Sequence, residues 1–209
     1  MDPEEIINQI EREVTGCTKC ELHYSRKRAV AGEGPVDAEM VLIGEGPGFH
    51  ENEQGRPFVG AAGKFLEDLL AKIGLSRKDV FITNIVKCRP PGNRDPQPEE
   101  INTCTSLYLE RQIHAINPKL IVTLGRFSLE RYLPKVKISN VHGQAFKIKG
   151  RLVVPMYHPA AALHQGSLRP VLERDFSQLP ELISGSGNVP EFREEESKPE
   201  QDPKQLSLF

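Results

Sequence analysis

The sequence lacks several features that would assign a protein class at once. No stretch of its 209 residues approaches the roughly 20 consecutive apolar residues of a membrane-spanning helix. The N-terminal segment, MDPEEIINQIEREV, is acidic and amphipathic, which argues against a secretory signal peptide. The formal net charge is only -2, so overall charge neither requires nor excludes a nucleic-acid partner. We therefore expect an intracellular protein on which any polyanion site is a local basic patch.

Two common nucleotide-binding motifs are also missing. The glycine-rich stretch GEGPG, residues 44–48, follows a short apolar run, but it does not contain the G-x-G-x-x-G pattern of dinucleotide-binding folds. It also lacks the lysine of a phosphate-binding P-loop. The glycines must therefore serve another purpose, either a plain turn or a close approach of the backbone to a ligand.

Disulfides are rare inside cells, so the four cysteines need another interpretation. Cys17 and Cys20 have chelate spacing, whereas Cys88 and Cys104 are 16 positions apart. Four thiolates suit zinc or an iron–sulfur cluster. Spacing alone also leaves open two inert pairs of buried thiols or a redox-active C-x-x-C pair. A metal site would tie the N-terminal segment to the loop that follows Asn84.

The rest of the pattern alternates strands with helices. Apolar runs predict strands at residues 40–44, 79–86, 119–125 and 152–158, and amphipathic segments predict helices after residue 3 and at residues 62–74, 98–116, 126–133 and 168–182. Such alternation is typical of a parallel sheet covered on both faces. We therefore expect a three-layer α/β/α fold with a central four-stranded parallel sheet, in which ligands bind outside the carboxyl ends of the strands.

Three of these strand ends offer a group suited to a planar ligand. Phe58, in RPFVG, follows the glycine-rich stretch after the first strand. Asn84 lies near the carboxyl end of the second strand and offers a donor and an acceptor side by side, which suits the edge of a base. His158 follows the fourth strand, before a predicted loop with Leu163 near its tip. Each residue alone would more simply be structural, but their coincidence favours a binding site.

These motifs together resemble those of the family 4 uracil-DNA glycosylases, the iron–sulfur members of their superfamily. The resemblance rests on GEGPG, GRPFVG, TNIVKCRPP and HPAAAL in this order, with four cysteines suitably placed, over roughly residues 10–180. It implies hydrolysis of the N-glycosidic bond of a uracil flipped out of single- or double-stranded DNA. It also implies a 4Fe–4S cluster bound by the four cysteines and a monomeric enzyme.

The resemblance assigns roles to individual residues. The uracil pocket would be formed by Gly44, Glu45, Gly46, Phe58, Asn84 and His158. Phe58 would stack on the base, and the Asn84 amide would accept from uracil N3–H and donate to O4. His158 would donate to O2 as negative charge gathers on the leaving base. Some branches of the superfamily carry Asp or Asn at the position that Gly46 occupies here, and glycine has no side chain to orient water. Glu45 is therefore expected near the water and Glu51 near the base.

Further residues are candidate DNA contacts: Arg89, Arg94, Leu163 and Arg169. One alternative is a neighbouring branch of the superfamily that crosslinks to DNA through a histidine. The corresponding stretch here is short and has no Arg-rich insert, although His142 is present. A second alternative is a non-catalytic nucleic-acid binder with a structural metal. A zinc or thiol hydrolase is disfavoured, because four cysteines would close a tetrahedral metal site.

The C-terminal segment differs from the rest of the chain. Residues 1–183 are expected to form the glycosylase domain, and residues 184–204 are rich in Gly, Ser, Pro, Glu and Lys, which favours a disordered linker. The final QLSLF resembles the peptide with which bacterial repair and replication proteins bind the sliding clamp. Gln205 would make polar contacts, while an apolar pocket would receive Leu206, Leu208 and Phe209. A bacterial clamp, and a cytoplasmic location near the nucleoid, are therefore expected.

Overall fold

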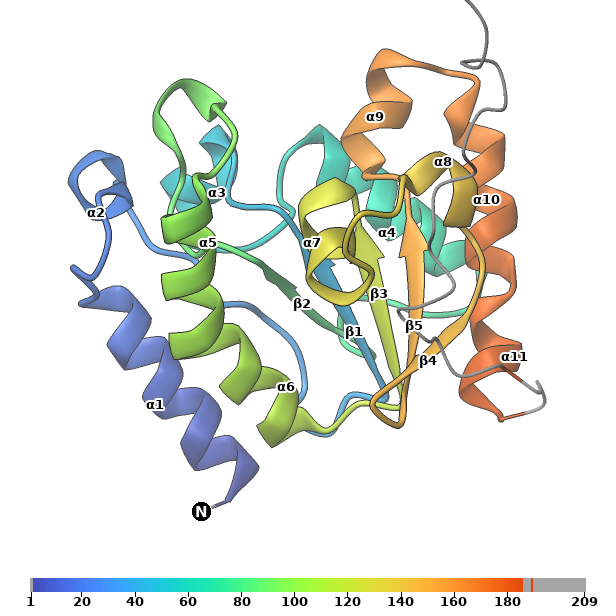
Figure 1. The fold of residues 1–209 in the computed structure, drawn as a ribbon, viewed down its shortest axis with the longest axis horizontal. Coiled ribbons are helices and arrows are strands. Elements are labelled where there is room, and N and C mark those ends of the chain that lie inside the picture. The colour runs from blue at the N-terminus through green and yellow to red at the C-terminus, as the bar shows by residue number, and fades with distance from the viewer. Residues whose placement is uncertain (1, 186–188, 190–209) are drawn as a thin grey trace, which may run out of the picture.

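The computed structural model describes residues 2–185 and residue 189, so the predicted clamp peptide and nearly all of the predicted linker lie outside the described residues. Within this part the expected three-layer α/β/α fold is confirmed (Figure 1). The sheet has the strand order β2-β1-β3-β5-β4. Its parallel strands are β1 (Met40–Gly44), β2 (Phe81–Asn84), β3 (Leu120–Leu124) and β5 (Arg151–Met156).

The sheet has five strands where four were predicted. The additional strand, β4 (Phe146–Ile148), runs antiparallel to β5 at the edge of the sheet. It is only three residues long, and its side chains are half-buried or exposed. It therefore leaves no apolar run in the sequence, which is why it was missed.

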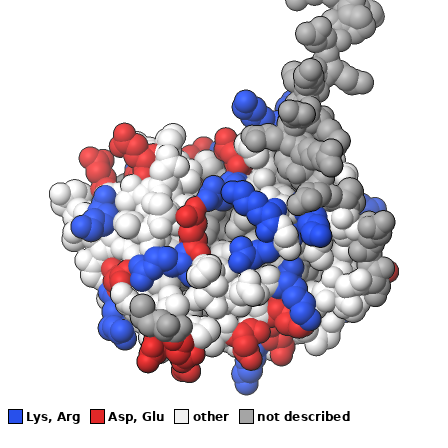
Figure 2. Space-filling model, turned by 60° about the horizontal axis from the view of Figure 1, so that its bottom comes forward, with Lys and Arg blue, Asp and Glu red and all other residues white. Residues whose placement is uncertain are grey.

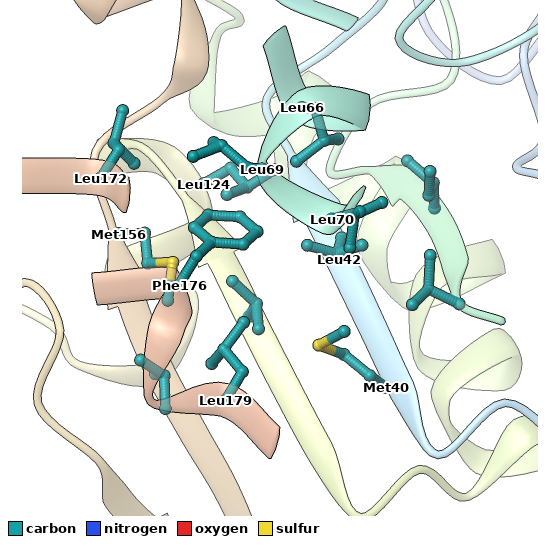
Figure 3. Packing of buried hydrophobic residues seen from close by; sticks show 14 of the residues in the cluster. Met40, Leu42, Leu66, Leu69, Leu70, Leu124, Met156, Leu172, Phe176 and Leu179 are labelled. Atoms are coloured by element: carbon teal, nitrogen blue, oxygen red, sulfur yellow. The ribbon is translucent and has the colours of Figure 1, made fainter. Parts of the chain in front are cut away.

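Each face of the sheet carries its own helices. One face packs against α1 (Pro3–Thr15) and α6 (Glu110–Ile116), and a π-helical turn, η2 (Thr105–Leu109), joins α6 to α5 (Pro98–Cys104). The other face packs against α4 (Ala61–Lys72), α10 (Leu168–Ser177) and α11 (Leu179–Ile183). Figure 3 shows this second core, where leucines of α4 and Phe176 of α10 close over Met40 and Leu42 of β1.

The segments after the strands differ in detail from the expectation. The glycine-rich stretch is followed at once by a short helix, α3 (Phe49–Gln54), because the glycines and proline end at residue 48. The predicted loop after His158 is also a helix, α9 (Pro159–His164). Proline is well tolerated in a first helical turn, and the three alanines that follow favour a helix.

The other short elements are α2 (Leu22–Ser25), η1 (Pro91–Asn93), α7 (Arg126–Tyr132) and α8 (Ile138–Val141). Within residues 2–185, no helix has both the length and the apolar character needed to cross a bilayer.

Candidate active site

The ends of β1 and β2 bring Gly44 and Asn84 together. The two residues are direct partners in the parallel ladder, and the pairing continues through Ile85 N–H, which donates to the Gly44 carbonyl at 2.9 Å. A Cβ atom at Gly44 would lie 2.7 Å from Cζ of Phe58 and closer still to Oδ1 of Asn84. Glycine therefore allows the Asn84 amide and the Phe58 ring to approach the end of β1 more closely than any side chain would permit.

The Asn84 amide is buried without the partner that its oxygen needs. The residue is 2% exposed, and in the described part of the chain Oδ1 accepts no hydrogen bond. Leaving a buried acceptor unpaired costs about 1–3 kcal/mol, so native structures rarely do so without a reason. The orphaned oxygen at the carboxyl end of a strand points to a ligand that donates a hydrogen bond.

Phe58 is held in an unusual backbone conformation. Its φ is 51°, a value that bulky residues rarely adopt. The Arg77 guanidinium donates to the carbonyls of Pro57 and Phe58 at 2.7 and 3.0 Å, and Gly63 leaves room for the Phe58 carbonyl. The Phe58 ring lies nearly parallel to that of His158, with 5.5 Å between centroids and 23° between planes. Strain of this kind is typical of functional sites.

The Glu51 carboxylate organises the loop that carries Phe58. Its Oε1 accepts from the backbone N–H groups of Val59 and Gly60, at 2.8 and 3.0 Å, and its Oε2 accepts from Gly48 N–H at 3.1 Å. These bonds fasten the segment after Phe58 to the beginning of α3. Glu51, which was expected near the base, thus already holds three backbone donors, a contribution that sequence reasoning missed.

His158 presents a neutral ring with a defined tautomer. The backbone N–H of Ala160 donates to Nδ1 at 3.1 Å, so the proton of the neutral ring is on Nε2. Burial lowers the pKa of His158 from 6.5 to about 4, against the opposing effect of the Glu51 carboxylate. At neutral pH the ring is therefore uncharged and can donate one hydrogen bond from Nε2.

Glu45 is the other titratable group at this edge of the sheet. Burial raises the pKa of its carboxyl, the Asp95 carboxylate raises it further, and Arg126 opposes both. In the described part of the chain the Glu45 carboxylate has no hydrogen-bond partner. At Gly46, a Cβ atom would lie 2.7 Å from Cγ2 of Val86, so close packing explains why this position carries no side chain.

The four cysteines line one small cavity beside α1 and η2: Cys17, Cys20, Cys88 and Cys104. As they stand, no three His, Cys, Asp or Glu side chains of the described residues are arranged to hold a metal ion. Donors nevertheless point at the sulfurs, since Arg26 donates to Cys88 Sγ and the Lys87 backbone N–H to Cys104 Sγ, both at 3.2 Å. Burial raises the pKa of Cys104 to about 12, and a bound cation is what turns such a thiol into a thiolate. The shared cavity and the donors that point at the sulfurs both fit a metal site with four thiolate ligands.

The predicted DNA contacts differ in their availability. Leu163, on α9, is 47% exposed. The Arg89 guanidinium lies 5.4 Å from the centre of the Phe49 ring, which is itself 54% exposed at the start of α3. Phe49 was not predicted, although an aromatic in the polar segment FHENEQ is a signal that could have found it. Arg94 is engaged with both oxygens of Glu100, at 2.7 and 2.9 Å, and so holds its own loop.

Arg169 and His142 also have partners within the protein. The Arg169 guanidinium lies 4.5 Å from the centre of the Phe65 ring and 3.5 Å from the Asp68 carboxylate. His142 Nδ1 lies 2.7 Å from the buried Asp175 carboxylate, which fixes the orientation of the ring.

A wide groove of the described residues lies away from this site. It has a volume of about 1080 Å³ and lies between α1, α6 and the edge of the sheet, where Ile6, Ile113 and Ile148 contribute apolar surface. None of the predicted site residues lines it. Its Arg131 is paired with Glu110, and Figure 2, which turns the bottom of the molecule forward, shows basic and acidic side chains interspersed. Size alone therefore does not locate the chemistry.

Comparisons with known proteins agree with this geometry. Residues 31–178 match the model of the uracil DNA glycosylase superfamily. The type-4 uracil-DNA glycosylase of Sulfurisphaera tokodaii is 50% identical over 186 residues, which are 84% of this chain and 84% of the relative. That of Archaeoglobus fulgidus is 46% identical over 187 residues, 85% and 94% of the two chains. That of Thermotoga maritima is 42% identical over 189 residues, 88% and 98% of the two chains.

Proposed function

Because the chain belongs to the uracil DNA glycosylase superfamily, we propose that Asn84, Phe58 and His158 together receive a uracil flipped out of DNA. The protein then hydrolyses the N-glycosidic bond, which begins base excision repair. The observation that carries the assignment is the buried, unpartnered Oδ1 of Asn84, because uracil N3–H supplies the donor that this oxygen needs. A flipped base is accessible to such a pocket, whereas a stacked one is not.

Base recognition follows from the groups around this space. Phe58 stacks on the base, which contributes about 1–3 kcal/mol by analogy with single-strand binding. Asn84 accepts from N3–H and donates to O4. Cytosine has an unprotonated N3 and an amine in place of O4, so both contacts become mismatched. Each unmatched buried group costs about 1–3 kcal/mol, which is enough to exclude cytosine.

Bond cleavage depends on charge that develops on the leaving base. As the bond between C1′ and N1 breaks, its electron pair moves to uracil, and Nε2–H of His158 donates to O2 without giving up its proton. Water attacks C1′, and Glu45 orients that water and receives its proton. Burial, which raises the Glu45 pKa, suits the carboxyl to this role. Glu51 serves as a positioning residue for Phe58.

Substitution of Asn84, whose amide is proposed to contact N3–H and O4 of uracil, tests this assignment. Asn84→Asp should relax discrimination against cytosine, because a protonated carboxyl can present the reverse hydrogen-bond pattern. The control is Asn140→Asp at an exposed position of α8, which should leave both rates unchanged. Excision is measured on uracil and on cytosine in the same mismatched duplex. An unchanged ratio of the two rates in Asn84→Asp would show that Asn84 does not read this edge.

The cysteine cavity supports a 4Fe–4S cluster held by Cys17, Cys20, Cys88 and Cys104. The cluster supplies no step of the hydrolysis and instead ties the end of α1 to the loop after Asn84. Cys88→Ala should abolish iron binding and the visible absorption of the protein, and should weaken DNA binding because Arg89 is displaced. Full DNA affinity in an iron-free, folded variant would contradict this role.

The chain's last five residues support binding of a sliding clamp by an otherwise monomeric enzyme, which would hold it near the nucleoid. Such a tether would keep the domain near newly copied DNA. Truncation after Lys204 should abolish clamp binding and leave excision from a free oligonucleotide unchanged. Bacterial and archaeal clamps are both assayed, since relatives of both kinds match the chain. Equal clamp affinity with and without the last five residues would refute the tether.

A further inference from the structure

Lys87 is a buried cation to which the reaction above gives no role. The residue is 1% exposed. Its Nζ lies 2.6 Å from Thr83 Oγ1, 2.7 Å from Gln112 Oε1 and 2.9 Å from the backbone carbonyl oxygen of Asn84. An ammonium group has three N–H donors, and these three oxygens match them in number. A buried ammonium is tolerated only when its donors are satisfied, and these three contacts account for the burial of Lys87.

Lys87 donates a hydrogen bond to a backbone carbonyl of β2 that has no partner strand on its side of the sheet. This strand is at the edge of the sheet, so alternate residues turn their backbone groups away from β1. Ile82 exchanges two hydrogen bonds with Glu33, at 2.7 and 2.9 Å. Two residues later the Asn84 carbonyl points in the same direction, past the end of that bridge. In the described part of the chain, the Asn84 carbonyl accepts its hydrogen bond from Lys87 Nζ.

The oxygens around Lys87 come from three separate segments. Thr83 Oγ1 donates to the Ala31 carbonyl at 3.0 Å, and Gln112 Nε2, from α6, donates to the same carbonyl at 2.8 Å. Thr83 and Asn84 are neighbours in a strand, so their side chains point to opposite faces of the sheet. Lys87 therefore holds the end of β2 from the α6 face, while the Asn84 amide lies on the pocket face.

The backbone of Lys87 is in turn fixed by the cysteine cavity. Its N–H donates to Cys104 Sγ at 3.2 Å, and its carbonyl accepts from Val30 N–H at 2.8 Å. Cys88 follows directly in the chain. Lys87 is thus bonded on one side to the cysteine site and on the other to the residue that reads the base.

Building on the proposed recognition of uracil by Asn84, we propose that Lys87 is a positioning residue, which aligns the Asn84 amide by holding the Asn84 carbonyl from behind the sheet. Through its backbone it also connects that alignment to the cysteine site. Removal of the ammonium leaves the Asn84 carbonyl unpaired and frees the strand end to shift. The effect should therefore fall on recognition of the base and not on contacts with the DNA backbone.

Lys87→Met tests the proposal, because methionine fills the volume of the lysine stem without its donors. In the full chain with its cysteine site loaded, the inhibition constant for free uracil should rise on the order of 10- to 100-fold. The value of kcat/KM for uracil excision should fall by a similar factor, and the preference for uracil over cytosine should narrow. Iron content and affinity for uracil-free DNA should stay as in the wild type.

The control is Leu179→Ala, a buried change in α11 that should lower thermal stability and leave uracil inhibition unchanged. If Lys87→Met does not fold, Gln112→Met removes one of the three acceptors and should weaken uracil inhibition about 3- to 10-fold. Unchanged uracil inhibition in the folded variant, with iron retained, would overturn the proposal. An equal loss of affinity for uracil and for uracil-free DNA would also overturn it, because that result indicates general disruption.

Discussion

Replacement of His158 isolates the contribution of one hydrogen bond to the leaving base. The ring donates from Nε2 because Nδ1 is occupied by Ala160 N–H, and its pKa of about 4 keeps it neutral at working pH. Removal of one preorganised donor of this kind costs about 2.7–4 kcal/mol, or on the order of 10²–10³ in kcat. His158→Ala should show that loss in single-turnover excision of uracil, with little change in affinity for uncleaved DNA. His158→Gln should recover part of it, since its amide can donate.

The same structure predicts the pH profile. Between about pH 5.5 and 8 the wild-type rate should show no step from His158, because its pKa lies well below the usual 6.5. The rate is measured at constant ionic strength for the wild type and for His158→Ala. A wild-type step near pH 6.5 that disappears in the variant would refute the neutral-donor mechanism. A variant that keeps more than a third of the wild-type rate would refute the hydrogen bond itself.

Three further results are expected. Glu51→Gln should lower stability by about 1–3 kcal/mol as well as activity, because an amide cannot accept from all three backbone donors; an unchanged melting temperature would contradict this. Phe49→Ala should weaken DNA binding about 3- to 30-fold in a titration, whereas Leu107→Ala on η2 should not. Because the pKa of His158 is lower in the folded than in the unfolded state, the unfolded chain binds more protons between about pH 4 and 6.5. Stability should therefore fall by up to about 3 kcal/mol as pH drops through that window, and His158→Gln should lose less in urea titrations.

The sequence predicted the layers of the fold because their signals are local. Runs such as MVLIG and KLIVTLG are long enough to identify buried strands, and their carboxyl ends necessarily meet at one edge of a parallel sheet. That rule alone brings Asn84 and His158 to the same edge as the glycine-rich stretch. The three-residue strand β4 and the short helices α3 and α9 have weaker signals, because each is too short to show a full hydrophobic period.

The supporting residues could not be predicted in the same way. A carboxylate such as Glu51 has the same appearance in a sequence whether it meets water or three backbone N–H groups. Lys87 would ordinarily be placed on the surface, because lysine is rarely buried. Its burial follows from the unpaired carbonyl of an edge strand, and which strand is at the edge depends on the order of the whole sheet.

The reason for glycine at residues 44, 46 and 48 could not be read from the sequence. Glycines in a loop suggest backbone conformations closed to other residues, yet Gly44, Gly46 and Gly48 all lie outside the left-handed region. What they provide is space, since a Cβ at Gly44 would meet Asn84 and Phe58, and one at Gly46 would meet Val86. The packing around Asn84, Phe58 and Val86 therefore depends on the absence of side chains at Gly44 and Gly46. A single methyl group at Gly44 would collide with both the Asn84 amide and the Phe58 ring and would displace the two groups that are expected to contact the base.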